Sequence, residues 1–418
     1  MLLWLLALGW SPRALASPVE TFGFLPTDEG RAGAAVASGE LASAAVTNPG
    51  ALASGERAEV ALAWRYEHLA LRLQGERART LDPHLAALGA GVPFTLGPLR
   101  AGAGFALALP DAFLARIALD PPTRPRMVLF DNRVHRVVFN AAVALELFRG
   151  VSLGVGATIF ADGAGNGVDF RVGAAPGRTV AEGALDVTLP LRAAPVVGLW
   201  VSRSPRWAFG LRASGPLSFV LALDVVAQAS VPGTSLDGDA VIAVRGVDFY
   251  TPAELCAGAR WSPTERLRLH AEVSLKRWSD APHPSSDVGV RIAIGVSPSL
   301  VSSRLPAPGW RDIVVPRVAL EQDLGAFTVR AGYAFLPSPV PRQTGATRYA
   351  DNDRHALSVG LGWTSRPWLG ARWRWDLALA WQHLVSREDT PREPLTPGGA
   401  LTSEGEVLGG SLGLRAGW

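Results

Sequence analysis

The sequence contains very little cysteine and lysine. Cys256 is the only cysteine among 418 residues, which excludes an intramolecular disulfide and a cysteine-based metal cluster. Lys276 is the only lysine, so nearly all of the 40 basic residues are arginines, and the net charge is +3. No block of like charges occurs, and the chain therefore lacks the basic footprint of a nucleic-acid-binding protein.

Long apolar runs are absent beyond the first residues. No later stretch reaches the ~18 to 20 uninterrupted apolar residues that a membrane helix needs. The start of the chain has a short apolar core, Leu2–Trp10, followed at 14–16 by a small-residue processing site. We predict a signal peptide at residues 1–16, although no basic residue precedes its core, which leaves an upstream start codon open.

Motifs for enzymatic chemistry are missing as well. The seven histidines are scattered, without an HExxH pair, and no GxSxG elbow occurs. Acidic clusters at 237–239 and 351–353 fit polar turns better than calcium loops. We therefore predict that the protein is not an enzyme and binds neither a cofactor nor a metal.

The sequence does contain strands with two unlike faces. Between Ala371 and Leu384, the odd positions up to Trp381 are apolar and the even positions include charged residues. Successive side chains of a strand point to opposite sides, so we expect one face toward lipid and the other toward an interior. The lipid-facing tryptophans would be Trp373, Trp375 and Trp381. The interior residues would be Arg372, Arg374, Asp376 and Gln382, of which the three charged ones would bind a plug or each other.

This two-residue period returns through the rest of the chain, which ends on Trp418. Clear examples are 99–109, 137–147 and 357–363. In the first such segment the apolar side chains change parity, from 60–66 to 69–73. Because no turn signal separates the two parts, we predict a β-bulge near Glu67 to Leu69.

Short and long connections alternate along the chain. Tight turns are expected at 97–98, 149–150, 202–206, 262–265, 323–325 and 365–369. Long loops are expected at 75–86, 110–133, 162–188, 229–249, 280–310, 337–353 and 387–406. This alternation is typical of outer-membrane barrels, and about fourteen strands fit between the connections. We predict an all-β fold, a 14-stranded antiparallel transmembrane β-barrel at residues 56–418; a secreted β-sandwich or propeller would not explain the loop lengths.

Residues 17–55 lack the strand period. A barrel of about fourteen strands encloses a lumen too wide for wall side chains to fill, so we predict that this segment folds inside as a hatch, or plug. The alternative is a disordered periplasmic extension. Phe22 and Phe24 would line an apolar path beside the hatch, or simply pack within it.

Several segments resemble a known family. The stretch GRAGAAVASGELASAAVTNPGALA at 30–53 is similar to the hatch of the FadL/TodX outer-membrane transporters of long-chain fatty acids and aromatic hydrocarbons. The segments 248–280, 316–341 and 351–363 resemble the strand and loop sequences of that family. The resemblance covers nearly the whole mature chain. It implies a 14-stranded barrel that releases hydrophobic molecules sideways through a gap at a kinked third strand.

The resemblance also assigns positions in this chain. The hatch motif Asn-Pro-Ala becomes Asn48-Pro49-Gly50 here, and the glycine leaves open how firmly the hatch is held. The third strand would be 99–109, where Gly102, Gly104, Ala106 and Ala108 leave the inner face bare and Pro110 cannot donate to the ladder. These glycines fit a lateral opening or, equally, close contact with the hatch. The third extracellular loop, 162–188, is shorter than in the prototype and partly strand-like.

These features predict passive uptake of hydrophobic small molecules across the outer membrane of a Gram-negative bacterium. Release would be sideways into the membrane. The expected partners are the substrate, outer-membrane lipids, lipopolysaccharide and the barrel-assembly machinery. The alternative is a structural, adhesive or general-porin barrel.

Overall fold

The computed structural model describes most of the chain. The described residues are 22–110, 124–131, 137–161, 164–175, 178–188, 191–230, 237–281, 287–294, 296–302, 309–345, 347–391 and 400–418. The predicted signal peptide lies outside these residues, as do residues 17–21 of the predicted hatch.

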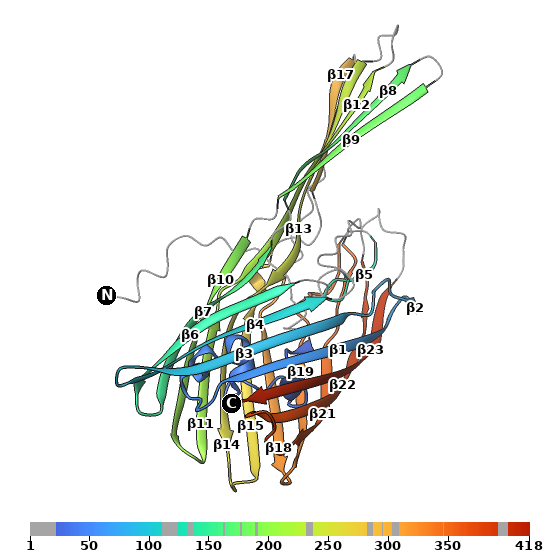
Figure 1. Ribbon diagram of the computed structural model, residues 1–418. Coiled ribbons are helices and arrows are strands. Elements are labelled where there is room, and N and C mark those ends of the chain that lie inside the picture. The colour runs from blue at the N-terminus through green and yellow to red at the C-terminus, as the bar shows by residue number, and fades with distance from the viewer. Residues whose placement is uncertain are drawn as a thin grey trace, which may run out of the picture.

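Within the described residues, fourteen strands close into an antiparallel barrel (Figure 1). In chain order they are β1 (Glu59–Leu73), β3 (His84–Leu96), β4 (Leu99–Pro110), β6 (Val138–Phe148), β7 (Val151–Ala161), β10 (Leu191–Ser204), β11 (Trp207–Ser214), β14 (Ala253–Trp261), β15 (Leu267–Arg277), β18 (Ile313–Asp323), β19 (Phe327–Leu336), β21 (Arg354–Thr364), β22 (Arg372–Asp389) and β23 (Leu401–Gly417). The ring closes because β1 pairs with both β3 and β23. The two-residue β2 (Glu76–Arg77) pairs only with β1. The predicted fold class is confirmed.

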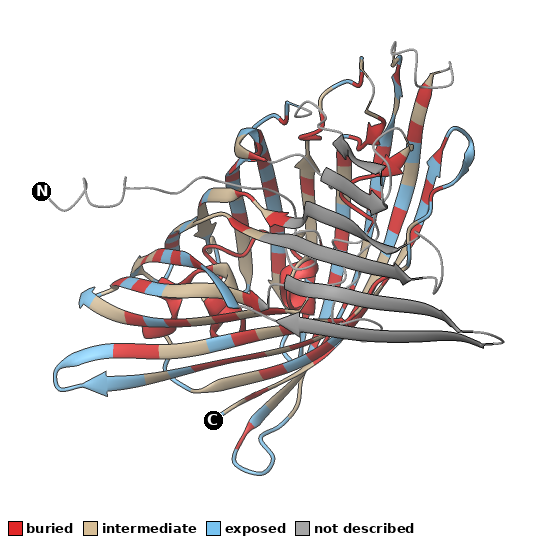
Figure 2. Cartoon of the chain, turned by 90° about the horizontal axis from the view of Figure 1, so that it is seen from above, coloured by how far each residue is buried: buried red, intermediate tan, exposed pale blue. Residues whose placement is uncertain are grey.

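The outer surface of the barrel is an apolar belt. On β22, Leu377 and Leu379 are 44% and 54% exposed, whereas Asp376 between Trp375 and Leu377 is 4% exposed. Figure 2 shows this alternation of exposed and buried residues along the strands. Such a belt is typical of the lipid-facing side of a transmembrane barrel. No helix among the described residues is long and apolar enough to cross a membrane.

The predicted faces of β22 are largely confirmed. Trp375 and Trp381 are exposed on the outer face, and Asp376 and Gln382 are buried on the inner one. Arg372 shares the inward parity but begins the strand, so it is exposed rather than buried.

A second sheet projects from one end of the barrel (Figure 1). Its strands are β8 (Ala164–Ala175), β9 (Arg178–Thr188), β12 (Leu217–Ser230), β13 (Asp237–Thr251), β16 (Asp287–Ile294) and β17 (Val296–Ser302). The prediction of loops at 162–188, 229–249 and 280–310 is therefore wrong for much of their length. The physical reason is continuity, since β12 follows β11 after two residues and β13 leads into β14 after one. All six predicted tight turns do join consecutive barrel strands.

The predicted bulge in β1 is wrong. β1 pairs with β23 along its whole length without a register shift. Arg65, Glu67, Leu69 and Leu71 are all at most 3% exposed, so one parity faces inward throughout. The residue pattern changes because the lumen itself changes, from a polar zone beside the hatch to an apolar cluster at the barrel end away from the short turns.

The N-terminal helices lie inside the barrel (Figure 1). They are α2 (Pro26–Glu29), α3 (Leu41–Thr47) and the 3-10 helix η1 (Pro49–Ala53). Their small side chains form a core with the inner faces of the strands. Two small elements complete the described structure at the opposite end from the short turns: a parallel bridge of β5 (Arg126–Met127) with β20 (Tyr349–Ala350), and η2 (Trp278–Asp280).

Candidate functional site

Glycines on the inner wall bring the barrel into direct contact with the hatch backbone. A Cβ added to Gly102 of β4 would lie 2.1 Å from the Leu52 carbonyl oxygen, and one added to Gly154 of β7 would lie 2.3 Å from the Pro49 carbonyl carbon. The same close approach recurs at Gly198 of β10 and Gly210 of β11. Glycine is required where two backbones meet this closely. We call these four glycines the glycine wall.

The side chain of Asn48 ties the hatch to this wall. It is 1% exposed, and its Nδ2 donates to the carbonyls of Val36 at 2.9 Å and Leu199 of β10 at 3.0 Å. Its Oδ1 accepts from the Gly50 amide at 3.0 Å. One amide group thus joins two parts of the hatch and one barrel strand.

The rest of the Asn48-Pro49-Gly50 motif has a steric explanation. Pro49 begins η1, where a fixed φ suits the first helical position. A Cβ at Gly50 would lie 2.8 Å from the Gly198 carbonyl oxygen and from the Trp200 amide nitrogen. Glycine therefore lets the hatch sit closer to β10 than alanine would.

The third barrel strand is β4, and its bare inner face is turned toward the hatch. Gly102 and Gly104 both approach Leu52, and Ala106 and Ala108 are at most 1% exposed. Pro110 ends the strand opposite Leu85 of β3. The ladders of β4 with β3 and β6 run without a register shift. A lateral opening at Gly102, Gly104 and Pro110 stays a prediction.

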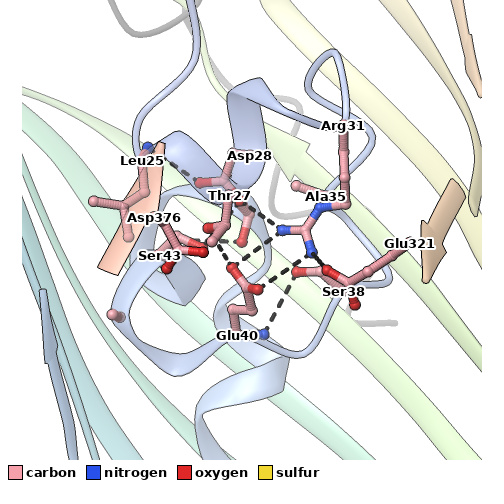
Figure 3. A network of polar contacts seen from close by, with 12 residues as sticks. Leu25, Thr27, Asp28, Arg31, Ala35, Ser38, Glu40, Ser43, Glu321 and Asp376 are labelled. Carbon is pink, nitrogen blue, oxygen red and sulfur yellow. Dashed lines mark hydrogen bonds and ion pairs between the residues drawn. The ribbon is translucent and has the colours of Figure 1, made fainter. Parts of the chain in front are cut away.

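A buried ion-pair network holds the other half of the hatch (Figure 3). Its centre is Arg31, which is 1% exposed and contacts Asp28 at 3.0 Å and Glu40 at 3.1 Å. Arg31 also lies 3.7 Å from Glu321 of β18, which connects the hatch to the wall. The Thr27 hydroxyl donates to Glu40 at 2.6 Å.

The network continues into the barrel strands. Arg330 of β19 is fully buried and contacts Glu321 at 2.6 Å and Asp376 of β22 at 3.0 Å. Arg415 of β23 lies 3.5 Å from Asp376 and 3.6 Å from the hatch residue Glu40. Asp376 also accepts from Arg374 at 3.0 Å. Arg374 and Asp376 thus pair with each other, as predicted for the polar residues of β22. Asp376 is linked to the hatch through Arg415, which contacts Glu40.

Two further contacts fix the hatch. The guanidinium of Arg65 on β1 lies 2.8 Å from the hatch carboxylate of Glu29. The carboxylate of Glu272 on β15 accepts from the backbone amides of Ala35 and Val36 at 2.9 and 2.8 Å. Sequence reasoning missed these contacts because no local pattern joins residues so far apart in the chain.

The pKa values of the two hatch carboxyls in this network, Asp28 and Glu40, are shifted in opposite directions. Burial raises the pKa of Asp28 to about 6, against the opposing charge of Arg31. Although burial alone would raise it, the pKa of Glu40 is held well below its usual range by Arg31 and Arg415. Glu40 is therefore the permanent anion of the network, and Asp28 is the group that titrates near neutral pH.

A cavity of about 200 Å³ lies beside the hatch. Its apolar lining includes Phe22, Phe24, Val36, Phe160 and Leu336. The two phenylalanines predicted to line an apolar path therefore do border this cavity. For scale, a dry apolar cavity of about 150 Å³ holds a benzene molecule.

The cations that border the cavity are paired with carboxylates. Arg212 and Lys276 lie 2.7 and 3.7 Å from Glu254, and Arg317 lies 3.2 Å from Glu272. The polar side of the cavity is therefore close to neutral.

An apolar cluster covers the lumen at the end away from the short turns. Phe22 belongs to it, so the cluster and the cavity share a wall. Its other large members are Leu69, Leu71, Met127, Phe130, Trp278, Trp310, Tyr349 and Leu384. We call the whole cluster, which also includes Val315 of β18, the mouth cluster.

Comparison with known proteins agrees with this architecture. No protein-family model and no curated protein matches the chain. Among solved structures, a Pseudomonas aeruginosa FadL homologue is 17% identical over 94% of this chain and 98% of its own, with a TM-score of 0.61. The P. putida toluene transporter TodX is 13% identical over 95% and 99%, at 0.54. The Ralstonia pickettii toluene transporter TbuX is 14% identical over 94% and 98%, at 0.52.

The fold and the site together define a class of protein. The described part of the chain is a β-barrel of fourteen strands with an apolar outer belt, whose lumen is plugged by the N-terminal segment. More particularly, it has the fold of the FadL and TodX channels, as the sequence resemblance predicted.

Proposed function

We propose that the protein is a passive outer-membrane channel for hydrophobic small molecules. The observation that carries this proposal is the shared wall between the mouth cluster and the cavity beside the hatch, formed by Phe22. A substrate would leave the mouth cluster, occupy the cavity and pass when the hatch shifts. Flow would follow consumption of the substrate inside the cell, without a cofactor or catalysis.

The hatch turn at Asn48, Pro49 and Gly50 is the part that we expect to move. It meets β10 and β7 directly, and Leu52, which follows it in η1, meets Gly102 and Gly104 of β4. Displacement of this turn would uncover the bare face of β4 at Gly102 and Gly104, where sideways release into the membrane would begin.

An uncharged hydrocarbon fits the cavity better than a fatty-acid anion does. Every cation that borders the cavity among the described residues has a carboxylate partner, so a substrate carboxylate would have to displace Glu254 or Glu272. Displacing a partner from a buried ion pair costs about 3 to 5 kcal/mol. The TodX and TbuX proteins, which share the fold, are toluene transporters.

The surroundings of the protein follow from its surface. The apolar belt would contact outer-membrane lipids and lipopolysaccharide. Insertion would require export through the predicted signal peptide, residues 1–16, and then the barrel-assembly machinery, which the strand ending at Trp418 would engage.

Deletion of residues 17–53 tests this function. Cells with the intact protein, the deletion variant or an empty vector are supplied with radiolabelled toluene or oleate. The intact protein should accelerate toluene entry, and the deletion should change that rate while the barrel keeps its heat-modifiable mobility on gels. No acceleration by the intact protein would refute the channel, and an unchanged rate in the deletion variant would remove the hatch from the mechanism.

A further inference from the structure

The wall of the barrel is incompletely paired between β18 and β19. This seam has seven ladder pairs, whereas the flanking seams β15–β18 and β19–β21 have ten each. The β18–β19 ladder ends at Arg317 and Ala334, immediately before Pro316. Proline brings no N–H to a ladder and is normally confined to strand edges and bulges.

The unpaired stretch between β18 and β19 is bounded by the last ladder pair, Arg317 with Ala334, and by a backbone hydrogen bond beyond the ends of the two strands. Residues 313–316 pair with β15 on their other side, and Phe335 and Leu336 pair with β21 on theirs, but no ladder pair joins the two stretches. The backbones meet again where the Arg311 amide donates to the Pro339 carbonyl at 2.9 Å. Between these limits lies a slit, at residues 312–316 and 335–338.

Apolar side chains close the slit in place of backbone hydrogen bonds. Val315 is 0% exposed and belongs to the mouth cluster, and Leu336 packs against the same cluster. On the outside, Val314 is 51% exposed on the apolar belt. The slit begins one ladder pair beyond Val318 and Tyr333, so it lies at the outer border of the apolar belt.

The slit lies next to the cavity and at the edge of the belt. Arg317, Ala334 and Leu336, which flank its lower part, all line the cavity. On the outside, the Tyr333 hydroxyl and His355 Nδ1 lie 2.9 Å apart, and aromatic side chains with a polar tip favour the level where hydrocarbon meets headgroups.

We propose that this slit is a side portal through which uncharged hydrophobic molecules pass between the cavity and the outer leaflet. The portal lies at the tenth and eleventh barrel strands and is separate from the third strand. It opens when Val315 and Leu336 part, which breaks apolar contacts but no backbone ladder. This proposal rests on the proposed function for the nature of the cargo, but its geometry can be tested without any cargo.

Cysteine labelling from the lipid phase tests the opening directly. Val315→Cys and the matched control Ala319→Cys both replace buried inward residues of β18, the first beside the slit and the second beside the continuous ladder. Outer membranes carrying either variant are treated with a maleimide attached to an acyl chain. Val315→Cys should react at least about tenfold faster, a difference equivalent to about 1.4 kcal/mol. Equal rates would overturn the portal, whatever the uptake result.

Closing the slit tests the passage. Continuing the register by one step places Pro316 opposite Phe335, so the pair Pro316→Cys and Phe335→Cys should form a disulfide across the slit. Val318→Cys with Tyr333→Cys is the matched control, because these two residues are already paired on the same strands. Toluene uptake should fall toward the empty-vector rate in the oxidised slit variant, recover on reduction, and stay unchanged in the control. Unchanged uptake in the slit variant would also overturn the portal, whereas failure of the intact protein to transport toluene would refute only the proposed function.

Discussion

Substitution of Arg31 by methionine should release the hatch from the barrel without unfolding the barrel. Methionine keeps an unbranched apolar stem but is shorter than arginine, and it removes the charge shared by Asp28, Glu40 and Glu321. Three carboxylates would then surround an apolar side chain, with Arg31 and its partners all buried or nearly so. The barrel keeps its closed ladder, because Arg31 belongs to no strand.

The size of the effect follows from burial. Removing one partner of a buried ion pair costs about 3 to 5 kcal/mol. Proton uptake by Asp28, whose pKa is already raised to about 6, would relieve part of this cost. A remaining penalty of about 3 kcal/mol would raise the population of the released hatch by a factor of roughly 100 to 200.

Limited proteolysis of the purified protein measures this population. Arg31→Met should be cleaved within residues 22–53 far faster than the intact protein, and both should show the same heat-modifiable mobility. Arg342→Met is the matched control, because Arg342 is 75% exposed and lies 3.8 Å from Asp389, a geometry that contributes little. Equal protection of the hatch in Arg31→Met and the intact protein would refute the view that this network holds the hatch.

Three further substitutions test the other parts of the site. Asn48→Ala should weaken the binding of the hatch to the barrel by about 1 to 3 kcal/mol, because it leaves the buried carbonyls of Val36 and Leu199 without a donor. Asn48→Asp should not restore the binding, because a carboxylate cannot donate a hydrogen bond. Proteolysis of the hatch measures both effects. Gly154→Ala should displace the hatch and raise proteolysis, whereas Gly345→Ala, with open space around its Cβ, should not; equal cleavage would argue against the glycine wall. Because the pKa of Asp28 is raised by folding, the stability that its protonation supplies is present in acid and lost as pH rises through about 6. Hatch protection should therefore be greater at pH 5 than at pH 7.5, and Asp28→Asn should remove this component; a pH response that Asp28→Asn leaves intact would exclude Asp28 as its source.

The strand pattern of the barrel was predictable from sequence because lipid imposes a strict rule on one face. Every outward residue meets the same solvent, so the apolar parity on β22 can be read without knowing its neighbours. The inner face follows no such rule. The residue types on the inner face depend on what each side chain contacts in the lumen. The change from polar to apolar contacts along β1 therefore resembles a bulge in the sequence.

The parts of the site differ in the same way. Asn48 lies in the segment 30–53 that resembles the family hatch, and Phe22 is a large apolar residue in a segment of small ones, so both could be picked out in advance. Arg31 and Glu321 could not be paired from sequence, because they are 290 positions apart and each is an ordinary charged residue in isolation. Gly154 did leave a signal, because it shares the inward parity of β7 with Gly156, whereas Gly198 is the only glycine of β10 and left none.

The two halves of the hatch are held by different forces, and this difference indicates which half moves. Around Arg31 the hatch is joined to β18, β22 and β23 through a network of buried charges, where loss of one partner costs about 3 to 5 kcal/mol. Around Pro49 and Gly50 it meets the glycine wall through close backbone contacts and carries no ion pair among the described residues. The glycine-held half is therefore the easier one to displace, with Asn48 as its main polar restraint. Under the proposed function, a hydrophobic molecule in the cavity would push this half away from β4 or leave on the other side between β18 and β19, while the charged half would keep the plug inside the barrel.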